Sequence, residues 1–401
     1  MFTIILIIIY IAFISLGLPD ALFGSAWPIM HGDLNVPVSY AGIVSMIIAG
    51  GTIISSLFSH KVIHKLGTGK VTAISVGMTA AALFGFSISN SFLVLCIWAI
   101  PYGLGAGSVD AALNNFVALH YKSRHMSWLH SFWGIGATMG PYIMGYYLTG
   151  GQTWNTGYRT ISVIQIVLTS ILIFSLPLWR KASAAPEGEE RKAKSLPMKE
   201  LIRLPGATPT LIAFFCYCAL ESTTGLWAAS YMVLNRGMST ETAAKWASLF
   251  YLGITVGRFL CGFITFRVSD KTMIRMGQGF TVLGIMMLIL PFGNLVMCIG
   301  FIIIGIGCAP IYPCIIHQTP VKFGANLSQA MIGMQMACAY TGSTFMPPLF
   351  GLLVGFIDIK LYPFFLTLFV IIMIVMLEKL NHTKTIGTSS EYHLNIAQDE
   401  E

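Results

Sequence analysis

Residues 92–119 read FLVLCIWAIPYGLGAGSVDAALNNFVAL, an apolar run that carries a carboxyl group at Asp110 and two side-chain amides at Asn114 and Asn115. A membrane-spanning helix needs about 20 mostly apolar residues, so this stretch predicts a helix that crosses a bilayer. The whole chain of 401 residues has the same character: 55% of it is hydrophobic, 10% is charged, and the mean hydropathy is +0.76. Soluble domains carry about 25% charged residues, so these values exclude a water-soluble fold.

Apolar runs of similar length recur along the chain and predict twelve transmembrane helices. They cover residues 2–25, 38–60, 70–89, 92–119, 127–149, 158–179, 208–234, 243–266, 272–291, 294–318, 327–355 and 359–380. The first run lacks the basic segment that opens a signal peptide, so we expect it to be retained as a helix. The eight cysteines lie inside these runs without clustering, so we expect neither a disulfide framework nor a metal site.

The basic residues predict the orientation of the chain. Most of the 23 Lys and Arg residues fall in segments that lie in the cytoplasm if the N-terminus does, and cytoplasmic loops are the ones enriched in these residues. We therefore expect a multi-pass protein of the cell membrane with both termini in the cytoplasm. The net charge of +7 reflects this distribution and gives no reason to expect nucleic acid as a partner. The partners we expect are the lipid bilayer and a small-molecule solute, and we expect the protein to be a monomer.

A polar break over residues 180–206, RKASAAPEGEERKAKSLPMKELIRLPG, divides the predicted helices into two groups of six. Its charges and three prolines are typical of a linker. The sequence thus predicts an N-terminal six-helix bundle over residues 1–179, a cytoplasmic linker over 180–206, a C-terminal six-helix bundle over 207–380 and a cytoplasmic tail over 381–401.

The two groups of helices share residues at a nearly constant spacing, which predicts an internal duplication. The matched sets are Asp20 and Gly24 with Glu221 and Gly225, Gly103 and Gly105 with Gly305 and Gly307, and Gly136, Pro141 and Gly145 with Gly342, Pro347 and Gly351. The predicted fold is therefore an all-α membrane protein with two pseudo-symmetric bundles. Such an architecture holds its solute between the bundles near the bilayer midplane.

Three acidic residues, Asp20, Asp110 and Glu221, lie deep within the apolar runs. An ionised side chain at the centre of a membrane helix costs about 2.5 to 3.5 kcal/mol on insertion scales, so such groups face a cavity or a partner. A carboxyl group removed from water can also take up and release a proton near neutral pH. We interpret the three as proton-coupling residues. The alternative is a structural ion pair or a hydrogen bond between helices.

These segments resemble a known family. Residues 110–117, Asp-Ala-Ala-Leu-Asn-Asn-Phe-Val, together with Asp20 after Pro19, are similar to the fucose permease branch of the major facilitator superfamily, whose members are sugar:proton symporters. In that branch an Asp in the first helix and a Glu in the fourth, followed by Ala-Ala-Asn-Pro-Phe-Val, are implicated in coupling and substrate binding. Residues 218–227 resemble the Gly-Ala-Glu-x-x-x-Gly-Ser pattern of the family's seventh helix. The resemblance implies the major facilitator fold and proton-coupled sugar transport.

The sequence departs from the family pattern at several positions. Asp110 stands where that branch has Glu, and Asn115 stands where it has Pro. In the superfamily signature between the second and third helices, residues 64–70, His64 replaces the usual Asp. Residues 136–145, with a Gly-Pro pair at 140–141, are similar to a motif of drug/proton antiporters, which keeps export of drugs or lipids as an alternative function.

Sugar recognition requires amides and hydroxyls for the ring oxygens and flat aromatic faces for the C–H surface. The candidate substrate-binding residues of these types are Asn114, Asn115, Gln165, Gln335, Tyr312, Tyr340, Trp27, Trp133 and Trp227. The candidate gating residues are Arg258, Gly136, Pro141 and Pro347, for which close packing of helices or snorkelling of the arginine is the simpler alternative. His130 and His317 are expected near the cytoplasmic ends of their helices.

The leading hypothesis is a secondary active transporter that moves a sugar by alternating access with proton coupling, without a resident cofactor. Sodium-coupled sugar uptake is a second hypothesis, because carboxylates and carbonyl groups freed by Pro and Gly can hold a cation. An enzyme needs a nucleophile paired with a base, or a metal cluster, and the short loops contain neither. A ligand receptor normally adds a soluble module, and the tail from Asn381 is too short for one.

Overall fold

The computed structural model describes residues 2–20, 22–37, 40–183, 196–290 and 292–383. These residues form helices joined by short connections, and no strand occurs among them. The α-helices are α1 (Phe2–Asp20), α2 (Leu22–Asp33), α3 (Ala41–Leu66), α4 (Thr68–Ser87), α5 (Phe92–His120), α6 (Ser123–Thr149), α7 (Trp154–Ser183), α8 (Met198–Arg203), α9 (Ala207–Arg236), α10 (Thr240–Ile264), α11 (Asp270–Ile289), α12 (Asn294–Phe323), α13 (Ala325–Phe356) and α14 (Tyr362–His382). A 3₁₀ turn, η2 (Ile359–Leu361), precedes α14.

The long helices confirm the predicted all-α membrane fold. Eleven helices of the described chain are long and apolar enough to cross a bilayer, with α1 and α2 taken together as one run from Phe2 to Asp33. The twelfth long helix, α6, is 27 residues long and is not among these eleven, and its first third carries Arg124, His125 and His130. A helix with such a composition needs neighbouring helices or water rather than lipid around its polar side.

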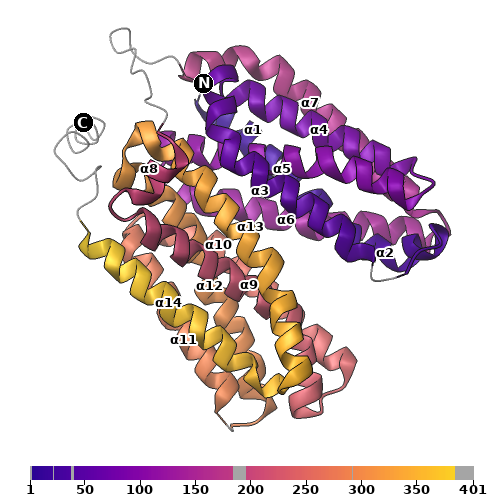
Figure 1. The fold of residues 1–401 in the computed structure, drawn as a ribbon, viewed down its shortest axis with the longest axis vertical. Helices are drawn as coiled ribbons and strands as arrows, with labels where there is room; N and C mark the ends of the chain where they lie inside the picture. Colours follow the sequence, from indigo (N-terminus) through magenta and orange to yellow (C-terminus); the bar gives the residue numbers. More distant parts are fainter. Residues whose placement is uncertain (1, 21, 38–39, 184–195, 291, 384–401) are drawn as a thin grey trace. The chain divides into compact units, whose positions relative to one another are not determined.

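The chain forms two compact units, whose helices Figure 1 shows as ribbons. Each unit has six long helices, with α1 and α2 taken as one. The first unit contains α1 to α4, most of α5 and α6, and α7, while the second contains the short helix α8 and the long helices α9 to α14. Residues 117–128, which connect α5 to α6, belong to the second unit. Residues 184–195 of the predicted linker and 384–401 of the predicted tail lie outside the described residues.

Close helix packing in each unit depends on glycines at matching places. In the first unit Gly103 of α5 lies directly against the carbonyl oxygen of Ile48 in α3, where an added Cβ would overlap that oxygen. In the second unit Gly305 of α12 lies in the same way against the carbonyl oxygen of Phe250 in α10. Small residues let helix backbones approach closely in membranes, so the sequence repeat corresponds to repeated packing.

Two further matched glycine pairs behave alike, and two do not. A Cβ at Gly105 would lie 2.7 Å from the carbonyl oxygen of Ser75, and one at Gly307 would lie 2.7 Å from that of Gly277. In the second pair that behaves alike, Gly136 packs against the carbonyl oxygen of Ile14 and Gly342 packs against that of Phe215. In contrast, Gly24 and Gly145 have open space beside them, whereas Gly225 and Gly351 adjoin Tyr251 and Trp227. The pseudo-symmetry is therefore strongest where helices cross within a bundle.

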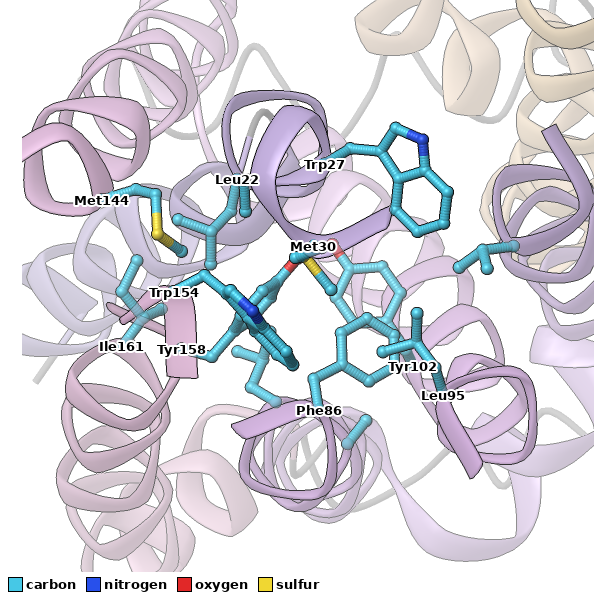
Figure 2. Close-up of a cluster of buried hydrophobic side chains, with 14 of the residues drawn as sticks. Leu22, Trp27, Met30, Phe86, Leu95, Tyr102, Met144, Trp154, Tyr158 and Ile161 are labelled. Atoms are coloured by element: carbon cyan, nitrogen blue, oxygen red, sulfur yellow. The ribbon is translucent and has the colours of Figure 1, made fainter. Parts of the chain in front are cut away.

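An aromatic cluster fills one end of the first unit (Figure 2). It is built on Leu22, Trp27 and Met30 of α2, with Phe86 of α4 and Tyr158 of α7 among the side chains packed below them. The Phe86 ring lies edge-on to the Tyr158 ring, with centroids 5.4 Å apart. Burial of such large side chains contributes about 1.5 to 3 kcal/mol each where it removes them from water. The cluster fixes α2 to the bundle.

Candidate functional site

Each unit carries polar side chains on its own helices, and the two sets are described separately. In the first unit Asp20 ends α1, directly after Pro19. Its carboxylate accepts a hydrogen bond of 2.8 Å from the indole nitrogen of Trp133 in α6 and one of 3.3 Å from the hydroxyl of Tyr102 in α5. Asp20 remains exposed at the surface of its unit. Three helices thus hold one carboxylate with donors on both oxygens.

A second carboxyl group of the first unit, Asp110, is buried in a chain of hydrogen bonds between α5 and α6. The Asn114 side-chain nitrogen donates to an Asp110 carboxylate oxygen at 2.8 Å and to the Asp110 carbonyl at 3.0 Å. The Asn114 side-chain oxygen then accepts from the His130 ring nitrogen Nε2 at 3.0 Å. The exposed fractions of the three are 5%, 0% and 6%. His130 is thus part of the polar interior, a role that its position near the predicted helix start did not indicate.

The spacing of residues on α5 explains part of this arrangement. Asp110 and Asn114 are four positions apart, so they lie on one face of the helix. Three glycines at 103, 105 and 107 precede them and bring α3 and α4 close to α5. Phe13 of α1 packs edge-on against the His130 ring at 5.5 Å. Apolar packing therefore closes the site around a short polar link.

The other candidate residues of the first unit have mainly structural contacts. Gln165 is buried and donates to the carbonyl of Ser15 at 2.6 Å, which joins α7 to α1. Trp27 is 5% exposed and belongs to the aromatic cluster of Figure 2. Asn115 is buried on α5 beside Asn114. Trp133 is half-buried, and its indole N–H is the donor to Asp20.

In the second unit an ion pair joins two helices. Glu221 lies near the middle of α9, and Arg258 lies on α10. The Arg258 Nη2 atom lies 3.5 Å from a Glu221 carboxylate oxygen and 3.3 Å from the hydroxyl of Tyr217. Tyr217 in turn donates to the carbonyl of Cys308 at 3.0 Å. Arg258 therefore has an acidic partner on a neighbouring helix, and that partner is Glu221.

The remaining candidates of the second unit divide by their partners. Gln335 of α13 and Thr319 of α12 are both buried and bond to each other at 3.0 Å. The Tyr312 hydroxyl lies 3.1 Å from the sulfur of Met336, and Tyr340 is half-buried on α13. Since the polar groups of Gln335 are bonded to Thr319, a solute would have to displace that contact to reach them.

The candidate gating residues lie at helix crossings within each unit. Gly136 packs against the Ile14 carbonyl of α1, and Pro141 follows five residues later on α6. In the second unit the buried Pro347 accepts a hydrogen bond at its carbonyl from the Trp227 indole, at 2.9 Å. This bond links α13 to α9, so Trp227 has a structural partner in addition to its predicted role as a substrate platform.

A cluster that the sequence did not single out fixes residues 117–128 within the second unit. The His317 imidazole of α12 lies 2.6 Å from the carboxylate of Asp270 in α11, and its other ring nitrogen lies 3.3 Å from the carbonyl of Tyr121. The Ser123 hydroxyl also donates to Asp270. Asp270 and His317 are far apart in the sequence, so no local motif marks their contact. The available signal was weak: an Asp at the start of one predicted helix and a His near the end of the next.

The first unit also contains an apolar groove between α3, α4 and α5. Its volume is about 290 Å³, and its lining includes Ile54, Phe58, Ile74 and Leu104. None of the candidate coupling or substrate-binding residues lines this groove. Its apolar lining suits contact with lipid better than contact with a polar solute.

Comparison with known proteins identifies the family. The Major Facilitator Superfamily model matches residues 9–328. The glucose/mannose transporter of Bacillus subtilis is 19% identical over 94% of this chain and 94% of its own length. Bypass of stop codon protein 6 of Saccharomyces cerevisiae is 24% identical over 65% of this chain, and the match spans 57% of that longer protein.

Solved structures show the same fold. The fucose:proton symporter of E. coli superposes with a TM-score of 0.69 at 14% identity, over 93% of this chain and 98% of that chain. The proton:xylose symporter bound to 6-bromo-6-deoxy-D-glucose superposes with a TM-score of 0.76 at 11% identity, over 93% of each chain. These likenesses confirm the fold and the resemblance predicted from the motifs. The chain belongs to the Major Facilitator Superfamily of membrane transporters.

Proposed function

We propose that the protein carries a small polar solute of the sugar type across the cell membrane by alternating access, with movement of the solute coupled to protons. The observation that carries the proposal is the buried link from Asp110 through Asn114 to His130. A carboxyl group at this depth is costly when ionised and without partners. A carboxyl group that has a polar donor and is removed from water meets the general conditions for taking up and releasing a proton, and the Asn114 amide supplies that donor here.

Asp20 supports the same proposal from a different helix. Its carboxylate has donors from Trp133 and Tyr102 but stays exposed at the surface of its unit. A carboxyl group of this kind is reachable by protons and by solute hydroxyls. Asp110 and Asp20 therefore offer a buried and an accessible acid in the same unit.

A sugar is the favoured solute for two reasons. The polar residues near these acids are amides, a hydroxyl and an indole, which bond neutral hydroxylated molecules well. The relatives with this fold include carriers of glucose or mannose, fucose and xylose. The distribution of Lys and Arg supports placing both termini in the cytoplasm, and we expect a monomer to be sufficient because each unit already contains its polar residues.

Coupling requires that the carrier changes conformation when it is empty or fully loaded and not when only one ligand is bound. This is a difference in free energy between states, set by how strongly each state binds the proton and the solute. Asp110 meets the requirement if its ionised form blocks the conformational change of the solute-loaded carrier.

The test is transport in proteoliposomes by wild type and by Asp110→Asn. Exchange of labelled sugar between equal pools should persist in the variant, while accumulation driven by an imposed pH gradient should be lost. The matched control is Asp358→Asn, an exposed carboxyl group before η2 that pairs with Lys360, and this variant should accumulate sugar as wild type does.

Other outcomes would overturn the proposal. Accumulation by Asp110→Asn at the wild-type level would remove Asp110 from coupling. A strict dependence on sodium, with no response to a pH gradient, would favour sodium-coupled uptake. Expulsion of cationic dyes with no movement of any sugar would favour proton-driven export.

A further inference from the structure

Arg258 is the buried cation among the described residues of the second unit, and its charge is poorly compensated. Arg258 is 4% exposed, and it lies on α10, a helix that is apolar enough to span the membrane. A buried guanidinium needs a well-placed counter-charge and acceptors for its N–H groups, because otherwise the cost of removing it from water is not offset. The contacts of Arg258 fall short of that need.

A comparison with the other Arg–Glu pair of the same unit, Arg275 and Glu378, shows how incomplete the contacts of Arg258 are. Arg275 donates through Nε and Nη2 to both carboxylate oxygens of Glu378, at 2.7 and 2.6 Å. Arg258 reaches Glu221 through Nη2 alone, at 3.5 Å. Charge-assisted hydrogen bonds are normally about 2.7 to 2.9 Å long. The exposed pair is thus bidentate and short, while the buried pair is single and long, which reverses the arrangement expected for a purely structural bridge.

The other groups around Arg258 do not complete its bonding. Its Nε atom is buried and has no hydrogen-bond acceptor. The Tyr217 hydroxyl accepts from Nη2 but uses its own hydrogen on the Cys308 carbonyl. The Tyr312 ring offers a π face with its centroid 6.0 Å from the guanidinium carbon. Arg258 therefore retains donor capacity for one more acceptor.

Glu221 is the more accessible partner of this ion pair. Its side chain is 19% exposed, against 5% for that of Arg258, so a solute at the surface of the unit can reach the carboxylate more easily than the guanidinium. One turn further along α9, Gly225 presents no side chain, and the exposed Tyr251 of α10 packs against it. A solute that binds Arg258 therefore has to reach it beside Glu221, its partner at 3.5 Å.

We propose that Arg258 anchors a carboxylate of the solute and that Glu221 is the counter-charge it holds when the site is empty, so that the solute is a sugar acid or a similar hydroxylated carboxylate. The inference rests on the proposed carrier function and narrows its substrate class. When the solute carboxylate binds Arg258, Glu221 takes up one proton at its carboxylate. The formal charge of the site is then the same before and after binding.

The surroundings of Glu221 fit this exchange of partners. The ionisable groups that face it are Tyr217 on its own helix, Tyr251 and Arg258 on α10, and Cys308 on α12. Tyr312 on α12 faces Arg258 instead. Arg258 is the single full positive charge among these groups. If the solute carboxylate takes Arg258, Glu221 loses its counter-charge, and uptake of one proton keeps the charge of the site unchanged.

The experiment compares ligands that differ only at one carbon. Binding of D-galacturonate and D-galactose, and of D-glucuronate and D-glucose, is measured on the purified full chain by calorimetry, and counterflow of the same ligands is measured in proteoliposomes. We expect wild type to favour the acid of at least one pair. Arg258→Gln should weaken binding of that acid by about 10- to 100-fold, the range for lost hydrogen bonds to a charged group, with neutral sugars changed less than threefold.

Glu221→Gln distinguishes a solute anchor from a structural ion pair. It leaves Arg258 without a competing carboxylate, so the acid should bind more tightly and proton uptake on binding, measured in buffers of different ionisation enthalpy, should disappear. A structural pair predicts the opposite, since either variant would then weaken folding and binding together. Arg275→Gln, which removes the exposed pair with Glu378, is the matched control. It should change neither the preference for the acid over the neutral sugar nor the proton uptake on binding.

Each remaining outcome has a definite meaning. Transport of neutral sugars, with no preference for the acids and no effect of Arg258→Gln on ligand choice, would overturn the inference and leave the proposed function standing. Absence of binding and counterflow for all four ligands in folded wild type would count against the proposed sugar-type solute itself. Tighter acid binding in Glu221→Gln, with the weakening in Arg258→Gln, would support both.

Discussion

Gly103 and Gly305 occupy equivalent places in the two bundles, each with its Cα against a carbonyl oxygen of the neighbouring helix, Ile48 in the first unit and Phe250 in the second. The relationship shows that the duplicated sequence preserves backbone contacts rather than surface chemistry. The coupling candidates differ between the units, because Asp20 has an indole and a phenol as partners while its counterpart Glu221 has an arginine.

Replacing either glycine by alanine should destabilise its bundle. The added methyl group would overlap a carbonyl oxygen, and overpacking of this kind costs about 1 to 3 kcal/mol. We expect Gly103→Ala and Gly305→Ala each to lower the thermal unfolding temperature in detergent. Gly279→Ala on α11, where the Cβ meets no atom within 4 Å, should leave that temperature unchanged or higher, and equal shifts in all three variants would contradict the packing argument.

Asn114→Ala should impair both stability and coupling. The substitution removes the donor to Asp110 and the acceptor for His130, and an unsatisfied buried polar group costs about 1 to 3 kcal/mol. Proteoliposomes should show reduced accumulation of solute at a given pH gradient. Asn155→Ala, which loses one bond to the Ser87 carbonyl, serves as the comparison, and a normal accumulation ratio in Asn114→Ala would argue against a role in coupling.

Trp227→Phe separates a structural role from a substrate platform. The variant keeps an aromatic ring near Phe350, whose centroid is 5.4 Å from that of Trp227, but loses the hydrogen bond to the Pro347 carbonyl. A bond of this kind contributes about 0.5 to 1.5 kcal/mol, so we expect a small fall in thermal stability with solute affinity unchanged. A large loss of affinity at unchanged stability would instead favour direct contact with the solute.

Asp270→Asn should loosen residues 117–128. The aspartate is the shared acceptor for His317 and Ser123, and its loss removes the ionic part of that contact. Hydrogen–deuterium exchange of the backbone amides in this segment should become faster, while exchange in α9 should not change. Two further contacts, the Trp128 indole to the Phe259 carbonyl and Arg124 over the Phe266 ring, remain in the variant. Unchanged exchange in the segment would mean that these two suffice.

The sequence predicted the helices well because lipid imposes a simple rule on length and polarity. The run predicted over 92–119 is α5, Phe92–His120, and the run predicted over 294–318 is α12, which continues to Phe323. The largest difference is at the start, where the run predicted over 2–25 extends to Asp33 as α1 and α2. Hydropathy alone places helix ends poorly when polar residues continue the helix beyond the apolar core.

The partners of the polar residues could not be predicted in the same way. Asp110 and Asn114 share a helix face, so their contact follows from spacing. The contacts of Asp20 with Tyr102 and of Glu221 with Arg258 join different helices that are far apart in the sequence. Sequence spacing therefore does not predict them. Trp27 shows the same limit for an aromatic residue. A tryptophan in a membrane protein can be a substrate platform, an interface anchor or a core residue. Its neighbours in the structure show that Trp27 is packed in the core.

Helix α13 contains Pro347 and Pro348 in succession, so the carbonyls of Ser343 and Thr344 lack the donors that a regular helix would supply. At this point α13 is held by a neighbouring helix instead, because the Trp227 indole of α9 donates a hydrogen bond to the Pro347 carbonyl. The same helix, α9, carries Glu221 six residues earlier. A shift of α9 on loss of the Arg258 contact would therefore pull on the Trp227 bond to α13, so the proposed solute anchor and the proline pair are connected through one helix.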